Sequence, residues 1–291
     1  MNAFPSRLLA TGALSVLAAC VTLTESPRAL VYEADRIAAV TLPCDVAARA
    51  ARAAPVPARD EPTVDPSAIR ILTWNIHKED DAGWQADLTR FASGSDILLL
   101  QEVTLREPIQ EILNAAGLRW VMASSFIYQS ADIGVMTAAR ALPVAICTQR
   151  FVEPVLRLPK SAVITWFRLP GTAQTLAIAN VHAINFSLSL GTYEAQFAAI
   201  GDALAGHQGP IVLGGDLNTW TRDREDAVRA VATRLGLVEI TFAQDQRTLF
   251  LGNQVDHLLV RGLDVVASQA IPVASSDHNP VTAVLRVTSG P

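Results

Sequence analysis

From residue 69 to residue 287, short apolar runs alternate with longer amphipathic stretches. Short apolar or alternating runs between turn residues indicate strands, whereas a 3.6-residue apolar repeat indicates a helix. Many strands with few helices favour a mixed sheet system that helices cover. Strands are therefore predicted at 70–74, 97–100, 133–137, 144–147, 162–168, 175–181, 211–213, 255–260, 265–268 and 281–287.

Amphipathic stretches with the helical repeat fall between these strands. Gly117, Gly206 and Gly236 each stand just past the end of one such stretch, as the C-caps of helices often do. Helices are therefore predicted at 84–91, 107–116, 192–205 and 224–235.

The first twenty residues have the pattern of a targeting signal. Arg7 provides a positive charge, and an apolar stretch too short for a confident membrane span runs from Leu8 to Ala19. The stretch ends in Leu-Ala-Ala-Cys20, which resembles the lipobox of bacterial lipoproteins. Residues 1–20 are therefore interpreted as a signal peptide, with cleavage before Cys20 and lipidation of its thiol. The alternatives are an ordinary secretory signal or an uncleaved apolar anchor. Each version places the remaining chain outside the cytoplasm, and the lipobox version anchors it to a membrane as a lipoprotein.

Residues 21–67 differ in texture from the rest of the chain. Five prolines fall between residues 43 and 66, and alanine and arginine dominate between them. Such a composition rarely builds a compact domain and is typical of a semi-extended spacer. We therefore expect a tether over 21–67, with 47–54 as a candidate short helix, and a catalytic domain over 68–291.

Composition narrows the classes of function. Half of the 291 residues are hydrophobic and 18% are charged, so the chain can build a sizeable core. The net charge of -5 argues against a protein that coats duplex DNA, although a nuclease with a metal site remains compatible with it. The cysteines form no Cys-x-x-Cys pair, which argues against a structural zinc site. Cys44 and Cys147 could form a disulfide in an oxidising compartment or remain two buried thiols.

Polar residues interrupt the apolar runs where predicted strands end. Asn75, Glu102, His182 and Asp216 each follow an apolar run. The carboxyl ends of strands are where open α/β sheets bind ligands. If these strands share an orientation, the four side chains line one rim.

Further polar residues stand near the beginnings of two predicted strands. Asp256 opens the strand at 255–260, and Asp277 and His278 precede the strand at 281–287. Strands that run in the opposite direction would bring these residues to the same rim. With Asn218, the set contains three aspartates, one glutamate, two asparagines and two histidines. This composition suits a hard cation such as Mg²⁺ or Mn²⁺, because such ions prefer oxygen ligands.

These polar residues belong to six short motifs, which together resemble the endonuclease/exonuclease/phosphatase (DNase I-like) superfamily. The motifs occur in the order of that family between residues 70 and 287. A single motif of this kind is weak, but six in order are specific to the family's chemistry rather than to one substrate. They are Thr73-Trp74-Asn75-Ile76, Leu99-Leu100-Gln101-Glu102-Val103, Asn180-Val181-His182, Gly214-Gly215-Asp216-Leu217-Asn218, Val255-Asp256-His257 and Ser276-Asp277-His278-Asn279-Pro280.

The resemblance implies a four-layer α/β sandwich, with two mixed β-sheets packed face to face and helices outside. It also implies hydrolysis of a phosphoester by a metal-positioned water. By the same resemblance, Asn75, Glu102 and Asp277 would lie at the metal, with Glu102 as the main ligand.

The resemblance also implies roles for the other residues of the set. Asp216 would orient or deprotonate the water, and Asn218 would help to hold water or phosphate. His182 and His278 would contact the phosphate, and Asp256 would fix the tautomer of His278. These roles agree with phosphoryl-transfer chemistry, which needs an aligned nucleophile and neutralised phosphate charge.

Other polar and aromatic residues are interpreted as structural. Lys160 and Arg157 are expected to be ordinary surface charges, and His207 a surface loop residue. His257 alternates with Asp256 along its strand and is expected to be packed. Trp220 follows the Asp216 motif closely and is the best candidate for a wall of the substrate site.

The sequence leaves three functions open. The first is a tethered phosphodiesterase or nuclease, and the second is a phosphatase or a sphingomyelinase-like lipid-headgroup hydrolase. The third is a non-catalytic surface lipoprotein, which the complete set of acids, amides and imidazoles argues against. The expected partners are a phosphoester substrate (nucleic acid, phospholipid headgroup or inositol phosphate) and a membrane that holds the lipid on Cys20. The chain is expected to be a monomer.

Overall fold

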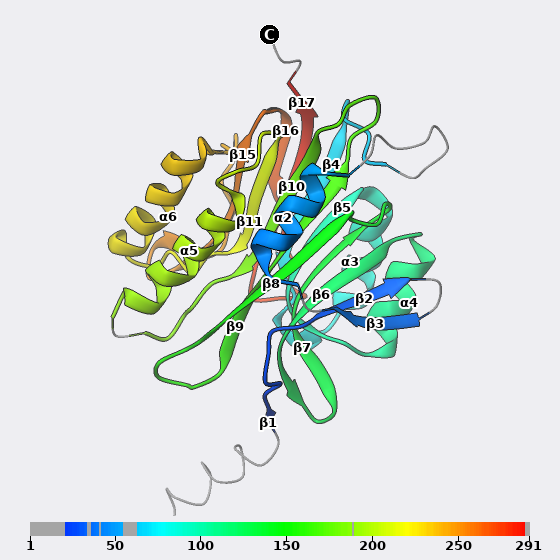
Figure 1. The fold of residues 1–291 in the computed structure, drawn as a ribbon. Helices are drawn as coiled ribbons and strands as arrows, with labels where there is room; N and C mark the ends of the chain where they lie inside the picture. Colours follow the sequence, from blue (N-terminus) through cyan, green and yellow to red (C-terminus); the bar gives the residue numbers. More distant parts are fainter. Residues whose placement is uncertain (1–20, 34–35, 41, 55–62, 188, 289–291) are drawn as a thin grey trace, which may run out of the picture.

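The computed structural model describes residues 21–33, 36–40, 42–54, 63–187 and 189–288. Two large β-sheets pack face to face, and helices cover their outer faces (Figure 1). This arrangement confirms the predicted four-layer α/β sandwich. No helix among the described residues is both long enough and apolar enough to cross a membrane. The proposed signal peptide at 1–20 lies outside the described residues.

The first sheet is nine-stranded and mixed. Strands β4 and β5 are parallel, and their neighbours β17 and β7 are antiparallel to them. Its strands, in spatial order, are β16 (Leu263–Ala270), β17 (Val281–Val287), β4 (Ile69–Asn75), β5 (Ile97–Thr104), β7 (Ala131–Ala139), β6 (Arg119–Tyr128), β2 (Ala29–Glu33) and β3 (Arg36–Val40), with β1 (Val21–Thr22) also paired to β6.

The second sheet is six-stranded, and its parallel pair β10–β11 lies between antiparallel neighbours. A separate two-stranded hairpin consists of β13 (Leu249–Phe250) and β14 (Asn253–Gln254). The strands of the second sheet, in spatial order, are β12 (Val238–Glu239), β15 (Asp256–Arg261), β11 (Ile211–Asp216), β10 (Thr175–His182), β9 (Pro159–Arg168) and β8 (Ala145–Val152).

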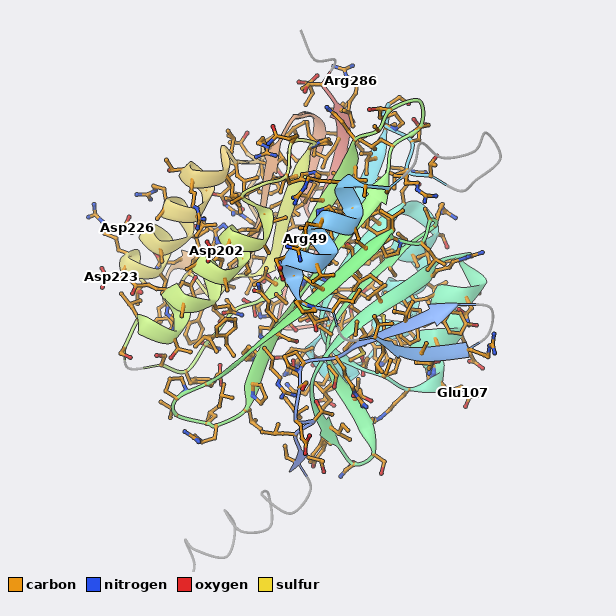
Figure 2. The ribbon with its side chains drawn as sticks, viewed as in Figure 1. Arg49, Glu107, Asp202, Asp223, Asp226 and Arg286 are labelled. Carbon is orange, nitrogen blue, oxygen red and sulfur yellow. A yellow bond between two sulfur atoms is a disulfide. The ribbon has the colours of Figure 1, made fainter. Side chains whose placement is uncertain are left out.

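Three apolar layers hold the sandwich together. The layer between the sheets contains buried side chains such as Ile71, Leu99 and Ile178. A second layer joins the first sheet to α3 (Trp84–Gly94) and α4 (Glu107–Ala115). The third layer joins the second sheet to α2 (Cys44–Arg52), α5 (Gly191–Leu204) and α6 (Arg222–Leu235). Figure 2 shows charged side chains of α5 and α6, among them Asp202, Asp223 and Asp226, pointing away from the sheets.

Each predicted helix and strand corresponds to an observed element, with small shifts at the ends. The pattern does not predict β6, because Ser124 and Ser125 interrupt its apolar run. Both serines are buried, and the hydroxyl of Ser125 lies 2.6 Å from that of Ser161 in the other sheet. Burial of polar side chains in such pairs cannot be recognised from periodicity alone.

The expected tether is wrong for the described part of residues 21–54, because this segment is folded onto the domain. Strand β2 pairs with β6, and α2 packs on the second sheet through Ala47, Ala48 and Ala51. The short helix expected at 47–54 is present, shifted to Cys44–Arg52. A disulfide joins Cys44 to Cys147 on β8 and fixes the start of α2 to the sheet.

Candidate active site

Four predicted site residues meet because their strands end at the same edge of the two sheets. His182 at the end of β10 is paired with Asp216 at the end of β11. Asp216 in turn is paired with Asp256, the first residue of the antiparallel strand β15. In the facing sheet, Asn75 ends β4 and its amide donates to Asp216 Oδ2 at 3.1 Å. The predicted convergence of parallel and antiparallel strand ends is therefore present.

A β-bulge directs Glu102 into this edge. The pairing of β5 with β7 shifts register between Leu100 and Val103, and Glu102 has a φ of 55°. Such bulges re-aim side chains and are frequent beside active sites. The preceding residue, Gln101, turns between the sheets instead, where its amide donates to Asn180 Oδ1 at 2.7 Å. Because of the bulge, the amide of Gln101 connects the two sheets while the carboxylate of Glu102 reaches the site.

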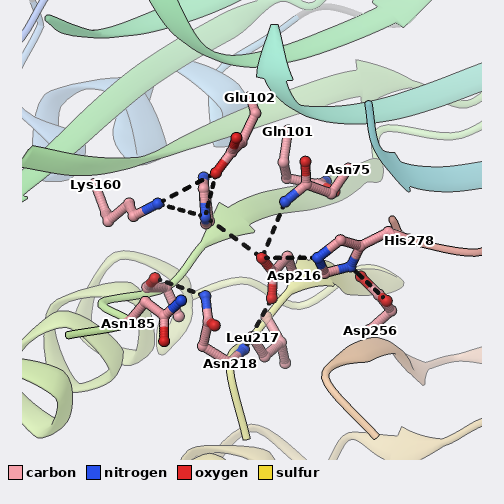
Figure 3. Close-up of polar contacts among 12 residues, drawn as sticks. Asn75, Gln101, Glu102, Lys160, Asn185, Asp216, Leu217, Asn218, Asp256 and His278 are labelled. Carbon is pink, nitrogen blue, oxygen red and sulfur yellow. Dashed lines mark hydrogen bonds and ion pairs between the residues drawn. The ribbon is translucent and has the colours of Figure 1, made fainter. Parts of the chain in front are cut away.

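Asp216 occupies the centre of the cluster (Figure 3). Its Oδ1 accepts from the backbone N–H of Asn218 at 3.1 Å, and its Oδ2 accepts from Asn75. Asn218 has a φ of 50°, and its side chain donates to the carbonyl of Ala183 at 3.1 Å. Asp216 is thus a buried carboxylate that polar groups hold from two sides.

His278 and Asp256 form a hydrogen-bonded pair beside Asp216. Nδ1 of His278 lies 2.8 Å from Asp256 Oδ2, and its Nε2 lies 3.9 Å from Asp216 Oδ2. Burial alone would lower the pKa of His278, but the charges of Asp256 and Asp216 raise it to about 10. Because Asp256 holds Nδ1, Nε2 faces the centre of the site with a proton to donate.

The other wall of the site contains His182, Glu102 and two lysines. Nε2 of His182 lies 3.4 Å from Asp216 Oδ2, 3.6 Å from Glu102 Oε1 and 2.8 Å from Lys160 Nζ. Burial and the charge of Lys160 lower the pKa of His182 to about 4. The ammonium of Lys160 can therefore donate to an unprotonated Nε2 of His182.

Glu102 is paired with both lysines. Its Oε2 accepts from Lys78, and its Oε1 lies 3.5 Å from Lys160. Burial would raise the pKa of Glu102, but His182 in its protonated form and the permanent charges of Lys160 and Lys78 lower it below its usual range. This carboxylate is therefore ionised and strongly neutralised by its neighbours.

The interpretation of Lys160 as an ordinary surface charge is wrong, since 16% of its side chain is exposed and it contacts two site residues. Lys78 was not predicted at all, although it stands three residues after Asn75. The interpretation of His207 as a surface residue is also wrong, because it is buried with Nε2 3.2 Å from the carbonyl of Pro210. Arg157 is exposed, as expected.

Asp277 is more exposed than the other acids and the histidines of the predicted set. More than half of its side chain is exposed, and it lies 3.9 Å from His77 Nδ1 at the margin of the site. His257 is packed, as expected, with Nδ1 2.6 Å from Glu239 Oε1. Trp220 stands at the rim, where its indole N–H donates to Asn185 Oδ1 at 3.0 Å.

The donor set fits a hard divalent cation. Asp216, Asp256 and His278 each offer a ligand atom within 4.8 Å of the others. However, an imidazole that is protonated and tied to Asp256 is a poor ligand, because metals bind the neutral ring. Glu102 and Asn75 offer oxygen atoms without that obstacle, and they face the same centre.

Comparison with known proteins identifies the family. The model of the endonuclease/exonuclease/phosphatase family matches residues 72–278. The chain belongs to this family. Enzymes of the endonuclease/exonuclease/phosphatase family generally use divalent metals, in agreement with the donor set.

Individual relatives support the same assignment. A UPF0294 protein of Klebsiella pneumoniae (strain 342) is 37% identical over 227 residues, which are 78% of this chain and 85% of that protein. The catalytic domain of human Nocturnin with bound sulfate has a similar fold, with a TM-score of 0.59 and 17% identity over 78% of this chain and 97% of that one. A mannosyl-6-phosphatase of Bacteroides thetaiotaomicron has a TM-score of 0.59 and 15% identity over 75% and 99% of the two chains. Family membership and these neighbours support a phosphoester hydrolase.

Proposed function

We propose that the protein is a divalent-metal-dependent phosphodiesterase in which Asp216 is the general base and His278 stabilises the phosphate. The observation that carries this proposal is the arrangement of Asp256, His278 and Asp216. It places a protonated imidazole Nε2 3.9 Å from a buried carboxylate oxygen. A phosphate oxygen needs a proton donor such as the imidazole, and the attacking water needs a proton acceptor such as the carboxylate. Both must lie close to the same phosphorus atom.

Asp216 is suited to accept the proton of the water. Its two oxygens already accept from the amide of Asn75 and the backbone of Asn218, which fixes the carboxylate plane. In the proposed reaction the water oxygen bonds to phosphorus, its proton passes to Asp216, and the ester oxygen leaves on the opposite side.

Positive groups surround the place where the phosphate would bind. His278 lies on one side, and Lys160 lies on the other at 2.8 Å from His182. Preorganised charges of this kind stabilise the charge that develops in the transition state. Glu102 and Asn75 would hold Mg²⁺ or Mn²⁺, and the bound ion would supply further neutralisation of the phosphate and a lower pKa for water.

A phosphatase is the second candidate, because the mannosyl-6-phosphatase of Bacteroides thetaiotaomicron has a similar fold over most of this chain. For the chain as a whole we also propose a monomer outside the cytoplasm that a lipid on Cys20 holds to a membrane. In a Cys20→Ser variant, labelling with a palmitate analogue and fractionation with membranes should both be lost. Wild-type protein that is soluble and unlabelled would contradict the anchor.

A substrate panel tests the proposed reaction. Full-chain protein would be assayed on bis-p-nitrophenyl phosphate, DNA, RNA, sphingomyelin and inositol phosphates, with Mg²⁺, with Mn²⁺ and with EDTA. Hydrolysis should disappear with EDTA and return with either metal. Hydrolysis of monoesters alone would favour the phosphatase.

Variants assign the reaction to this site. Asp216→Asn and His278→Ala should each lower turnover by about two to three orders of magnitude. Asp202→Asn is the matched control, because this exposed aspartate lies on α5 and forms an ion pair with Arg234 at 2.7 Å. If both site variants keep wild-type turnover on a confirmed substrate, the proposed site is not the catalytic one.

A further inference from the structure

Exposed apolar side chains gather at the end of the molecule that holds the active site. Most of the exposed large hydrophobic residues in the described chain belong to segments that border the strand ends described above. They are absent from the helix faces of α5 and α6, where exposed charges lie. We call the following set the apolar rim: Leu23, Val152, Val155, Leu156, Phe186, Leu249, Phe250 and Leu251.

Direct contacts join the segments of the apolar rim. The ring of Phe250 packs edge-on against Trp220 with centroids 6.1 Å apart, and Trp220 donates to Asn185. The buried carboxylate of Glu153 accepts from the backbone N–H of Asn185 at 2.7 Å and of Phe186 at 3.2 Å. The hairpin at 249–254, the loop after β10 and the loop after β8 are therefore one connected surface.

The apolar rim also borders a cavity that opens from the catalytic cluster. This cavity has a volume of about 170 Å³. Glu102, Lys160 and His182 line its polar part, and Leu156, Leu158 and Phe186 line its apolar part. Such a cavity matches a molecule that has a phosphate beside an apolar portion.

The described chain begins beside this surface. Val21 and Thr22 pair with Tyr128 and Ile127, the last residues of β6, at the active-site end of the first sheet. The guanidinium of Arg150 donates to the hydroxyl of Thr24 at 2.8 Å, which holds this segment against the end of β8. Figure 1 shows β1 at the end of the molecule opposite the final strand β17. The lipobox cysteine, Cys20, directly precedes this fixed point.

We infer that the apolar rim docks on a lipid bilayer and that the site hydrolyses a phosphoester of a lipid headgroup. This inference rests on the proposed phosphoester hydrolysis and adds the partner and the substrate class. The loop 154–158 has the sequence Pro-Val-Leu-Arg-Leu and the hairpin tip 249–252 has Leu-Phe-Leu-Gly, so the apolar loops carry one positive charge and no acid. A nucleic-acid surface would need a much more basic lining. Apolar side chains among few charges favour the interface of a bilayer.

A fluorescent probe tests docking without any requirement for catalysis. The full chain with Leu251→Cys would be labelled with bimane, and Val266→Cys is the matched control because this residue is exposed on the edge strand β16, outside the apolar rim. Unsubstituted protein gives the background labelling. Vesicles of phosphatidylcholine and phosphatidylglycerol should shift the emission at position 251 to the blue, and brominated lipids should quench it. Equal responses at positions 251 and 266, or no response at either, would overturn the inference.

Charge substitutions test the substrate class. Val155→Asp/Leu251→Asp adds two negative charges to the apolar rim outside the cavity lining. Val238→Asp/Val266→Asp adds the same charges at exposed positions that do not belong to the rim. The rim variant should hydrolyse a phosphodiester lipid in vesicles about tenfold more slowly than wild type, because charged groups resist transfer into the interface. Its turnover of soluble bis-p-nitrophenyl phosphate should be unchanged, and the control should match wild type on both substrates.

The outcomes separate the two proposals. If wild type hydrolyses no phosphoester while position 251 still responds to vesicles, the proposed function fails and the docking surface stands. If soluble substrate is hydrolysed but the rim variant and the control behave alike on vesicles, the docking inference fails alone. A concentration-dependent dimer that only the rim variant abolishes would identify the surface as a contact between copies and would also overturn the inference.

Discussion

Replacing Gly215 by alanine tests whether the close approach of β10 and β11 positions Asp216, the proposed catalytic carboxylate. Gly215 has a φ of 138°, a conformation that residues with a side chain rarely adopt. A Cβ at this position would overlap the carbonyl oxygen of Val181 and lie 2.9 Å from its carbonyl carbon. The next residue is Asp216, so any displacement acts directly on the proposed base.

Two effects lower the free energy of unfolding of the Gly215→Ala variant. An L-residue forced into this backbone conformation costs about 1–3 kcal/mol. The overlap with Val181 involves backbone on a paired strand, which cannot rotate away as a side chain can, and overpacking of this kind costs about 1–3 kcal/mol. We therefore expect the free energy of unfolding to fall by about 2–6 kcal/mol, a large share of the stability of an ordinary domain.

Urea unfolding followed by tryptophan fluorescence measures the stability loss. Gly94→Ala is the matched control, because a Cβ there meets no atom within 4 Å and the residue ends α3. It should change the free energy of unfolding by no more than about 1 kcal/mol. The folded fraction of Gly215→Ala should also turn over about a hundredfold more slowly, since misplacement of a catalytic group by about 1 Å has this effect. Wild-type stability and turnover in Gly215→Ala would refute the reasoning.

Three further predictions concern other parts of the molecule. Cys44→Ser/Cys147→Ser should lower the free energy of unfolding, measured by heat or urea, by about 2–4 kcal/mol. The reason is that the disulfide closes a loop with a sequence separation of 103, and unchanged stability would contradict this prediction. Burial lowers the pKa of His207 from 6.5 to about 4, so the stability it contributes is complete above pH 6.5 and is lost as the pH falls toward 4. The free energy of unfolding of His207→Gln should therefore vary less with pH between 4 and 6.5 than that of the wild type. An equal variation in both proteins would count against the burial argument. Lys160→Met should lower kcat/KM on a confirmed substrate by about two orders of magnitude, because the ammonium beside His182 is lost, and wild-type kinetics would exclude the lysine from the site.

The residues of the candidate site could be predicted where polar residues follow or precede apolar strands. The same rule also applies to Lys160, which is the second residue of the antiparallel strand β9, much as Asp256 is the first residue of β15. Lys78 was harder to predict, because it belongs to a left-handed turn at 77–79 that no periodicity signals. The direction of Glu102 depends on a bulge, and a bulge arises from pairing with a distant strand rather than from local sequence.

The N-terminal segment shows why composition misled about residues 21–54. An alanine-rich composition predicts a spacer, yet Ala47 and Ala51 are fully buried because a small side chain lets α2 approach the sheet closely. This correction matters for function. A flexible tether would let the domain move far from the proposed anchor, whereas the pairing of Val21 with β6 keeps the domain next to the start of the described chain. If the proposed lipid is attached to Cys20, the anchor and the candidate active site would face one bilayer together.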